Sequence, residues 1–443
     1  MKASRGMNRR TFLGAGLLGA AALGASCARN HSVRKPSRSS VAEAFDREME
    51  SFMAARNVPG GALAIVKDRR LVYARGYGWA DRDKKVPATA SSLFRIASVS
   101  KPITAVAVLK LVEEGKLSLD ARAFDIVPLP PVIENGREPD VRLKRITIRQ
   151  LLQHTGGWDR EKSYDPMFRP KLIAEKTHTP PPAGTEAVIR YMLGQPLDFD
   201  PGSRYAYSNL GYCVLGRVIE NISGLDYDKF VREKLLAPVG IQRMQIGASL
   251  EGRQANGEVR YYTTGPSLAN NVFPNAAEKV PWPYGGFHLE AMDAHGGWIA
   301  SVVDLARFSA ALDDPGRSPL LKPDSVRAMY EPPAAPVSRQ ANGALGDSWY
   351  GCGWSVRPVR NERANYWHNG SLPGTATLLV RRWDGLSWAA LFNQRSEDKS
   401  LPDSAIDPAL HRAAAAVTEW PKEDLFQREE LTGQPKSLAL VPS

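Results

Sequence analysis

The sequence is poor in cysteine and shows no pattern of metal ligands. Its three cysteines, Cys27, Cys213 and Cys352, include no Cys-x-x-Cys pair, and its seven histidines include no close pair with metal-ligand spacing. We therefore expect neither a metal site nor another cofactor. Cys213 lies in an apolar helical run and Cys352 in an apparent strand over 350–356. Small buried thiols are the commoner explanation for such positions, so we predict no disulfide.

The N-terminal segment lacks the apolar length to span a membrane. Arg9 and Arg10 precede an apolar, glycine- and alanine-rich stretch that reaches Cys27 and is shorter than the roughly 20 residues of a spanning helix. This pattern predicts a twin-arginine export signal over residues 1–28, with a Sec signal as the alternative. Lipidation of Cys27 and cleavage after Ala28 fit about equally well. The predicted location is the periplasm or the extracellular space, with membrane anchoring left open.

Beyond this segment the chain lacks a strong excess of charge of one sign. The whole sequence carries a formal net charge of +11, but four basic residues lie in 1–28 and four in 29–40, and neither stretch holds an acidic residue. Residues 41–443 therefore keep only three of the eleven excess positive charges. We expect a basic tether over residues 29–40 and no nucleic-acid partner.

The chain also lacks a long low-complexity linker after residue 40, and it has no internal repeat. Hydrophobic patterning predicts a helix over 41–56, strands over 61–66 and 71–77, a hairpin over 375–380 and 386–392, and a final helix over 403–417. Residues from about 120 to 300 are irregular and helical in pattern. We therefore expect the two ends of the chain to share one antiparallel sheet.

The first chemical motif is Ser98-x-x-Lys101, which puts a hydroxyl and an amine three residues apart where a loop enters a helix. Positions i and i+3 share a helix face, so Lys101 can accept the proton of Ser98. The apolar run over 103–112 predicts a mostly buried helix, and burial lowers the pKa of a lysine amine. The alternative is that Ser98 only caps the helix. Two further matches to this spacing lie in polar stretches without such a helix, at 32–35 and 396–399.

The second motif is Tyr207-x-Asn209, between a Pro-Gly turn at 201–202 and an apolar run that predicts a helix. A phenol near a cationic lysine can be held partly ionised and can pass a proton to a leaving group. The Asn209 side chain can hold a substrate amide. The alternative is a buried tyrosine beside an asparagine helix cap.

The third motif is His368-x-Gly370, which enters the predicted hairpin. Glycine at 370 lets a ligand approach the strand backbone, and the N–H of Ser371 can then polarise a carbonyl. His154-x-Gly156 and His295-x-Gly297 also fit this pattern, but neither precedes a hairpin.

Together, in this order and context, the three motifs resemble those of the serine β-lactamase and penicillin-binding protein superfamily. The nearest likeness is to the branch with class C β-lactamases, DD-peptidases, D-aminopeptidases and family VIII esterases. It covers about Val41 to Trp420 and leaves 421–443 as a tail. The resemblance implies an α/β (α+β) fold in which an antiparallel sheet flanked by helices is built from about 41–120 and 301–420. A helical part from about 121–300 is inserted, and the active site lies in the cleft between them.

The resemblance also implies a role for each motif residue. Ser98 is the expected nucleophile, Lys101 its activating amine, and Tyr207 the general base and acid. Asn209 is expected to hold the substrate. The backbone N–H groups of Ser98 and Ser371 are expected to form the oxyanion hole.

The third motif departs from many relatives of this superfamily. Many have a lysine where this chain has His368, and that lysine attracts the carboxylate of a penicillin or a D-alanyl terminus. A histidine is largely neutral at pH 7 unless it is perturbed, so a standing positive charge is lost. His368, Gly370 and Ser371 remain expected substrate-site residues. We see no match to the glutamate that class A β-lactamases use for deacylation.

The sequence therefore predicts an exported serine hydrolase that cleaves an ester or amide bond of a small molecule or peptide through an acyl-enzyme. A carboxylesterase or D-amino-acid-type peptidase ranks above a β-lactamase. The alternative is a penicillin-binding or sensor protein that is acylated but turns over poorly. Trp282 and Tyr284 either line an apolar acyl pocket or pack in the core. The sequence makes no prediction of oligomeric state.

Overall fold

The computed structural model describes residues 40–134, 136–264, 268–274, 277–340, 342–359 and 363–428. The predicted export signal, most of the predicted tether, Cys27 and the end of the tail lie outside the described residues. Cys213 and Cys352 are buried free thiols. Over the described ranges, none of the helices has the length and apolar character needed to cross a membrane. Nor do three His, Cys, Asp or Glu side chains come together there as a metal site.

An antiparallel sheet of eight strands forms the centre of the described chain, in the order β3-β2-β1-β13-β12-β11-β10-β9. Its strands are β1 (Gly60–Lys67), β2 (Arg70–Asp81), β3 (Val86–Pro87), β9 (Trp349–Tyr350), β10 (Ser355–Val359), β11 (Arg363–Leu372), β12 (Thr375–Arg381) and β13 (Leu386–Phe392). Strand β1 pairs with β13, from Gly61 opposite Phe392 to Lys67 opposite Leu386. The prediction that the two ends of the chain share one sheet is therefore confirmed.

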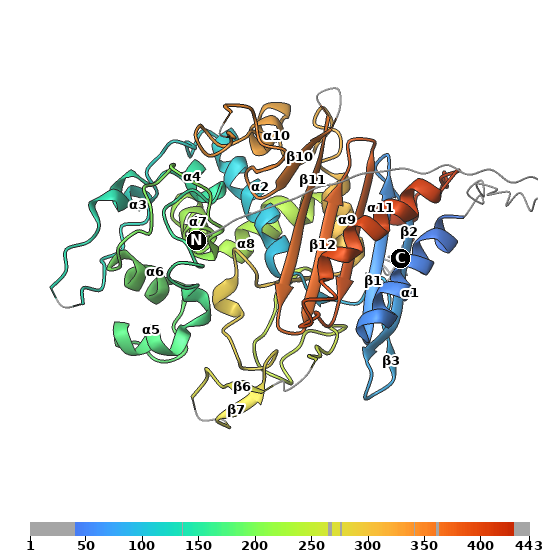
Figure 1. Cartoon of the computed structure of the whole chain (residues 1–443), viewed down its shortest axis with the longest axis horizontal. Helices are drawn as coiled ribbons and strands as arrows, with labels where there is room; N and C mark the ends of the chain where they lie inside the picture. The colour runs from blue at the N-terminus through green and yellow to red at the C-terminus, as the bar shows by residue number, and fades with distance from the viewer. Residues whose placement is uncertain are drawn as a thin grey trace, which may run out of the picture. The chain divides into compact units, whose positions relative to one another are not determined.

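Helices cover both faces of this sheet. In chain order they are α1 (Val41–Arg56), α2 (Ser100–Glu113), α3 (Ala123–Ile126), α4 (Ile148–Leu152), α5 (Pro170–Thr177), α6 (Thr185–Leu193), α7 (Asn209–Ser223), α8 (Tyr227–Val231), α9 (Val302–Ala310), α10 (Pro323–Tyr330) and α11 (Ile406–Ala416). Because strand side chains alternate, Leu63 and Ile65 pack in the cluster with α1 and α11, whereas Ala62 and Ala64 join the larger core with α2 and α9. Figure 1 shows α1 and α11 side by side against the sheet.

The middle of the chain is largely helical, as predicted, and carries two small sheets. One contains β4 (Phe94–Arg95), β8 (Trp298–Ala300) and β5 (Gln245–Ile246), and the other pairs β6 (Leu268–Asn270) with β7 (Lys279–Pro281). Helices α3 to α7 lie at the opposite end of the picture from α1 and α11 (Figure 1). The expected α/β fold with an inserted helical part is therefore confirmed.

One predicted element differs. The single strand expected over 350–356 is two short strands, β9 and β10, which pair with each other in antiparallel register. Gly351 and Gly353 make the reversal: a Cβ at Gly351 would lie 2.5 Å from the Met329 carbonyl oxygen, and Gly353 has a φ of +81°. The glycines of this segment were its only signal of a turn.

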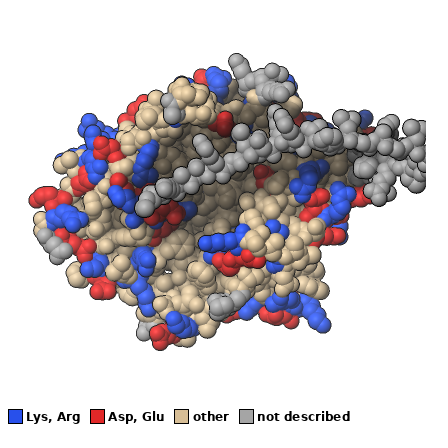
Figure 2. All heavy atoms as spheres, viewed as in Figure 1, with Lys and Arg blue, Asp and Glu red and all other residues tan. Residues whose placement is uncertain are grey.

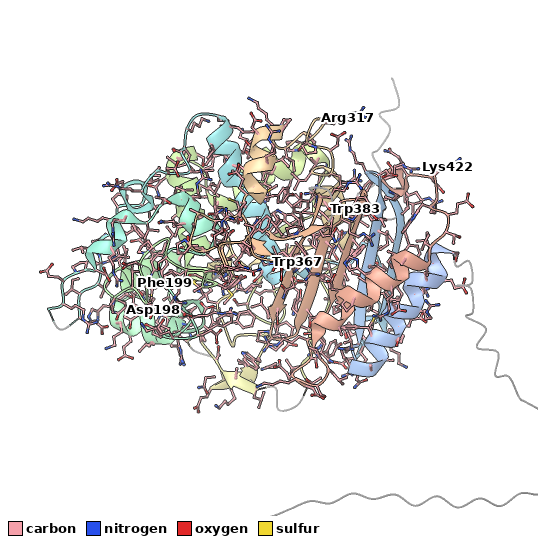
Figure 3. All side chains as sticks on the ribbon, turned by 45° about the horizontal axis from the view of Figure 1, so that its top comes forward. Asp198, Phe199, Arg317, Trp367, Trp383 and Lys422 are labelled. Carbon is pink, nitrogen blue, oxygen red and sulfur yellow. The ribbon has the colours of Figure 1, made fainter. Side chains whose placement is uncertain are left out.

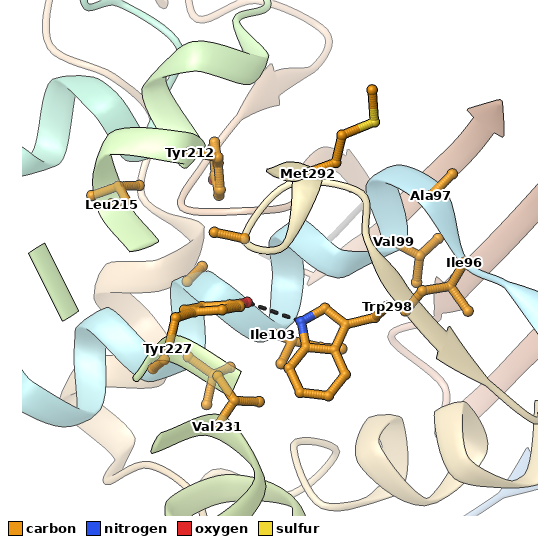
Figure 4. Close-up of a cluster of buried hydrophobic side chains, with 14 of the residues drawn as sticks. Ile96, Ala97, Val99, Ile103, Tyr212, Leu215, Tyr227, Val231, Met292 and Trp298 are labelled. Carbon is orange, nitrogen blue, oxygen red and sulfur yellow. Dashed lines mark hydrogen bonds between the residues drawn. The ribbon is translucent and has the colours of Figure 1, made fainter. Parts of the chain in front are cut away.

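Buried aromatic side chains pack against α2 in the core (Figure 4). Trp298 donates from Nε1 to the Tyr227 hydroxyl at 3.1 Å, and that hydroxyl also bonds with the Thr104 hydroxyl of α2 at 2.6 Å. All three side chains are fully buried. These bonds fix the helix that begins beside Ser98 and carries Lys101.

Both signs of charge are mixed on the surface in Figure 2, with Lys and Arg beside Asp and Glu over the face in view. This agrees with the near balance of charge over residues 41–443.

Candidate functional site

Ser98 lies in a short 3₁₀ turn, η1 (Ala97–Val99), that runs directly into α2. The helix cap is Val99, whose side chain makes no capping bond, so the alternative that Ser98 caps the helix is wrong. Ala97 has a φ of +47°, a conformation that non-glycine residues adopt at a cost of order 1–3 kcal/mol. This turn leaves Ser98 partly exposed while both of its neighbours are buried.

Strands β11 and β12 hold this turn in place. The Thr377 hydroxyl donates to the Ile96 carbonyl at 2.9 Å. A Cβ at Gly370 would lie 2.5 Å from the Ile96 carbonyl oxygen and 3.0 Å from the Ala97 Cβ. Gly370 therefore makes room for the backbone that carries Ser98, whereas the sequence suggested that it makes room for a ligand. Because Gly370 and Ala97 touch, their neighbours Ser371 and Ser98 are brought to the same place.

Lys101 is fully buried and makes three hydrogen bonds. Its Nζ lies 3.2 Å from the Ser98 Oγ, 2.7 Å from the Asn209 Oδ1 and 2.9 Å from the His295 carbonyl oxygen. Burial lowers the pKa of the amine well below its usual value, nearby Asp165 raises it, and Arg160 lowers it further. The predicted depression of this pKa is confirmed in direction.

The arrangement around Lys101 suits proton transfer. A neutral amine has two N–H donors and one lone pair. The donors can remain on Asn209 and on the His295 carbonyl, and the lone pair can then accept the hydroxyl proton of Ser98. The protonated form has three donors for the same three acceptors. Both protonation states are therefore satisfied without moving a side chain.

Tyr207 approaches the same centre from the loop before α7. Its ring lies 4.7 Å from the Lys101 Nζ, and its hydroxyl bonds with Ser98. Burial raises the pKa of the Tyr207 phenol, an effect larger than the lowering by the Ser98 bond. The expectation that a cationic Lys101 holds this phenol partly ionised is therefore wrong, because desolvation outweighs the lowering of the pKa by Ser98 and Arg160. A protonated phenol is placed to act as an acid.

Asn209 is held between the Lys101 amine and the Asp165 carboxylate. Its Oδ1 accepts from Lys101, and its Nδ2 donates to the Asp165 Oδ2 at 2.6 Å. Asp165 also caps the short turn η3 (Pro166–Phe168) by accepting from the Met167 N–H. Asp165 was not identified from the sequence, because its only local signal was that of a turn cap before proline.

His368 is buried and neutral. Its Nδ1 lies 2.7 Å from the Asn369 carbonyl oxygen, so this nitrogen carries the proton, and its Nε2 accepts from the Tyr350 hydroxyl at 2.9 Å. Burial, and then the charge of Lys101, lower the pKa of His368 to about 3. The expected loss of a standing positive charge at this position is confirmed. Tyr350, which fixes the ring, was not identified from the sequence.

Ser371 lies where one side of β11 is open. Strand β10 pairs with β11 from residue 363 to residue 367, whereas β12 continues alongside it to Leu372. Residues 368–372 therefore have a strand on only one side within the described chain. Arg395 donates to the Ser371 Oγ at 3.4 Å and lies 5.4 Å from the Trp282 ring centre.

Of the two aromatic residues proposed for an acyl pocket, Tyr284 packs in the core. It is 3% exposed, and its hydroxyl accepts from the Tyr261 N–H at 2.8 Å. Trp282 is 37% exposed and stands beside Arg395.

Two histidines that were set aside as chance matches lie at the site. The His154 ring centre is 4.3 Å from that of Tyr207, and its Nδ1 accepts from the Ser208 N–H. The His295 carbonyl is one of the three acceptors for Lys101. The other Ser-x-x-Lys match in the described chain, at 396–399, lies in a loop whose residues 397–399 are exposed, and the match at 32–35 lies outside the described residues.

Comparison with known proteins identifies relatives over most of this chain. Residues 45–412 match the sequence profile of the family described as Beta-lactamase. Penicillin-binding protein 4* of Bacillus subtilis (strain 168) is 25% identical over 355 residues, which are 79% of this chain and 71% of that protein.

Solved structures show the same fold. The D-amino acid amidase from Ochrobactrum anthropi SV3, complexed with L-phenylalanine amide, has a TM-score of 0.63 at 21% identity and covers 85% of this chain and 98% of its own. EstCE1, a hydrolase with promiscuous acyltransferase activity, has a TM-score of 0.64 at 19% identity, with coverages of 86% and 98%. At these identities the likeness is one of fold alone.

Proposed function

This chain belongs to the beta-lactamase family and is a serine hydrolase, and on that premise we propose that it hydrolyses esters or D-amino-acid amides through an acyl-enzyme on Ser98. The observation that carries this proposal is the Lys101 amine, buried, lowered in pKa and bonded to the Ser98 Oγ. A serine without such a base is a poor nucleophile near neutral pH.

Neutral Lys101 accepts the proton of Ser98 as the Oγ attacks the carbonyl carbon. The backbone N–H groups of Ser98 and Ser371 stabilise the negative charge that develops on the carbonyl oxygen. Tyr207 gives its phenolic proton to the leaving alcohol or amine as the bond from the carbonyl carbon to that atom breaks, which leaves a phenolate. Water then attacks the acyl-enzyme and gives a proton to this phenolate, the bond from the carbonyl carbon to the Ser98 Oγ breaks, and the Oγ takes back the proton that Lys101 accepted.

The preference for neutral esters and amides follows from the lack of a positive charge at His368, in the third motif. His368 is neutral and is bonded on both nitrogens, so it supplies no cation for a carboxylate beside the scissile bond. This favours neutral esters and amides over penicillins. The D-amino acid amidase and the hydrolase EstCE1, which share this fold, are consistent with the same ranking.

The residues near the N-terminus support a proposal that the protein is located in the periplasm or the extracellular space. We propose export through the paired arginines Arg9 and Arg10, with Cys27 or the Ala28 cleavage site deciding whether the protein stays on a membrane. Fractionation of cells that express the full chain, with Arg9→Lys and Arg10→Lys together as the comparison, tests this. Retention of the double variant in the cytoplasm supports twin-arginine export, and unchanged export contradicts it.

The activity is tested by release of p-nitrophenol from p-nitrophenyl butyrate, with nitrocefin alongside. We expect turnover of the ester by the wild-type protein, little cleavage of nitrocefin, and neither with Ser98→Ala. Intact mass spectrometry distinguishes a hydrolase from the alternative, a sensor protein that is acylated but turns over poorly. A stable adduct without turnover indicates a sensor, and turnover that survives in Ser98→Ala contradicts the proposal.

A further inference from the structure

A pocket of about 330 Å³ lies next to the catalytic groups. It is lined by Tyr205, Pro333, Val337, Ser348, Trp349, Tyr350, Ser355 and Trp367. Four of these eight residues are aromatic, and none of the eight is charged. Figure 3 labels Trp367 on its strand near the middle of the molecule. The composition suits a flat apolar group whose only polar contacts are with hydroxyls.

Two residues connect this pocket to the catalytic groups. Tyr350, one wall of the pocket, hydrogen bonds His368 through its hydroxyl. Tyr205, another wall, lies two residues before Tyr207. The ring centre of Tyr350 is 6.4 Å from that of Tyr207 and 6.1 Å from that of Tyr205. One wall of the pocket, Tyr350, therefore stands between it and the rings of Tyr207 and His368, and another wall belongs to the loop that carries Tyr207.

The position of Tyr207 identifies which half of the substrate enters the pocket. During acylation the bond between the Ser98 Oγ and the carbonyl carbon forms, and the bond from that carbon to the leaving oxygen or nitrogen breaks. The leaving atom takes the phenolic proton of Tyr207, so it must lie within hydrogen-bond reach of this hydroxyl. The remainder of the leaving group then extends towards Tyr205 and Tyr350.

We propose that this pocket is the leaving-group subsite and that it selects esters of arylalkyl alcohols, or the corresponding amides. The proposal rests on the proposed function, because it assigns the two halves of the substrate around Ser98. Tyr205 is 44% exposed, so the pocket opens to solvent and the released alcohol or amine can leave through it.

The test compares ethyl acetate with 2-phenylethyl acetate. Both give the same acetyl-enzyme, so deacylation is identical, and the two alcohols are similar in acidity. Any preference in kcat/KM therefore reports binding of the phenyl group during acylation. We expect 2-phenylethyl acetate to be favoured by about tenfold, the scale at which apolar pockets discriminate.

The matched variants are Tyr205→Ala and Trp383→Ala. Tyr205 is a half-exposed pocket wall, and Trp383, 45% exposed, follows β12 and is absent from the pocket lining. We expect Tyr205→Ala to reduce the preference for 2-phenylethyl acetate towards unity and Trp383→Ala to preserve it. Ser348→Trp, which fills the pocket from an exposed position, is expected to act in the same direction as Tyr205→Ala.

The outcomes separate the subsite from the catalytic mechanism. Ser98-dependent hydrolysis of both acetates without a preference, or with a preference that Tyr205→Ala and Ser348→Trp leave unchanged, overturns the subsite and leaves the proposed function standing. A preference that appears only in a series of acyl groups, such as phenylacetate against acetate, assigns the pocket to the other half of the substrate and also overturns it. If neither ester is hydrolysed in a Ser98-dependent way, both proposals fail.

Discussion

The two sides of Ser98 are built on opposite principles. On the helical side, a buried amine, a carboxamide and a carboxylate follow one another in the chain of bonds Lys101, Asn209 and Asp165. On the strand side, His368 is neutral and hydrogen-bonded through both ring nitrogens, and residues 368–372 of β11 have a strand on only one side within the described chain. Charged groups and proton transfer are concentrated on the helical side. The strand side contacts the substrate through its surface and its backbone donors.

This difference separates rate from selectivity. Changes on the helical side alter the protonation of Lys101 and thus the rate for every substrate. Changes on the strand side alter which substrate is bound, because no proton of the reaction passes through His368. The predictions below test this division, from the largest expected effect to the smallest.

The largest effect is expected for Lys101→Ala. Removal of a general base costs about a hundredfold or more in rate. The measurement is kcat for p-nitrophenyl butyrate, with circular dichroism as a check that the variant is folded. The same loss should appear for 2-phenylethyl acetate and for a D-amino-acid amide. A near-normal rate would show that Lys101 is structural.

The next effect is expected for Asp165→Asn, which removes the charge that opposes the depression of the Lys101 pKa. The pKa of Lys101 then falls further, so the neutral amine persists to lower pH and the acid limb of the kcat/KM profile moves to lower pH. We also expect about a tenfold loss of kcat, because Asn209 loses its charged partner. Asp200→Asn, at an exposed carboxylate, is the control. An acid limb that stays in place in Asp165→Asn would contradict the role of this charge.

A selectivity effect is expected for His368→Lys. A cation at this position can bind the carboxylate of nitrocefin, and a charge-assisted hydrogen bond supports about a tenfold gain. The ratio of nitrocefin cleavage to butyrate ester cleavage should therefore rise. His411→Lys, at the other face of the sheet, should leave the ratio unchanged. A fall in both activities with a constant ratio would show that His368 affects the rate for every substrate and not the selectivity.

The smallest effect is expected for Tyr350→Phe. The His368 Nε2 loses its donor in a buried place, which costs about 1–3 kcal/mol of unfolding free energy. Urea denaturation measures this loss. Because His368 carries no proton of the reaction, kcat for ethyl acetate should change less than threefold, an energy of roughly 0.6 kcal/mol. A hundredfold loss would show that this bond belongs to the catalytic chain.

Prediction from the sequence succeeded where local pattern and chemistry coincide. The apolar run after Lys101 gave both the buried helix and the direction of its pKa shift, and the hairpin after His368 gave two adjacent strands. It failed where the deciding neighbour is distant in the chain. Asp165 meets Asn209 across 44 positions, and Gly370 is needed because η1 packs against it. A single sequence without these contacts shows only a turn cap and a flexible residue.

The prediction for Tyr207 shows the same limit. Its nearness to a cation was expected to lower the pKa of the phenol, but its burial, which was considered from the sequence only as the alternative, raises that pKa. The magnitude of desolvation depends on all the elements around the ring, including His154 and Tyr350.

The most direct test is rapid-quench mass spectrometry of the protein with p-nitrophenyl butyrate, followed by peptide mapping. We predict a butyryl group on the peptide that contains Ser98, formed and lost at rates consistent with kcat and absent in Ser98→Ala. A butyryl group on another residue, or steady turnover with no acylated Ser98 at any time, would contradict the acyl-enzyme and with it the division of the site into two sides.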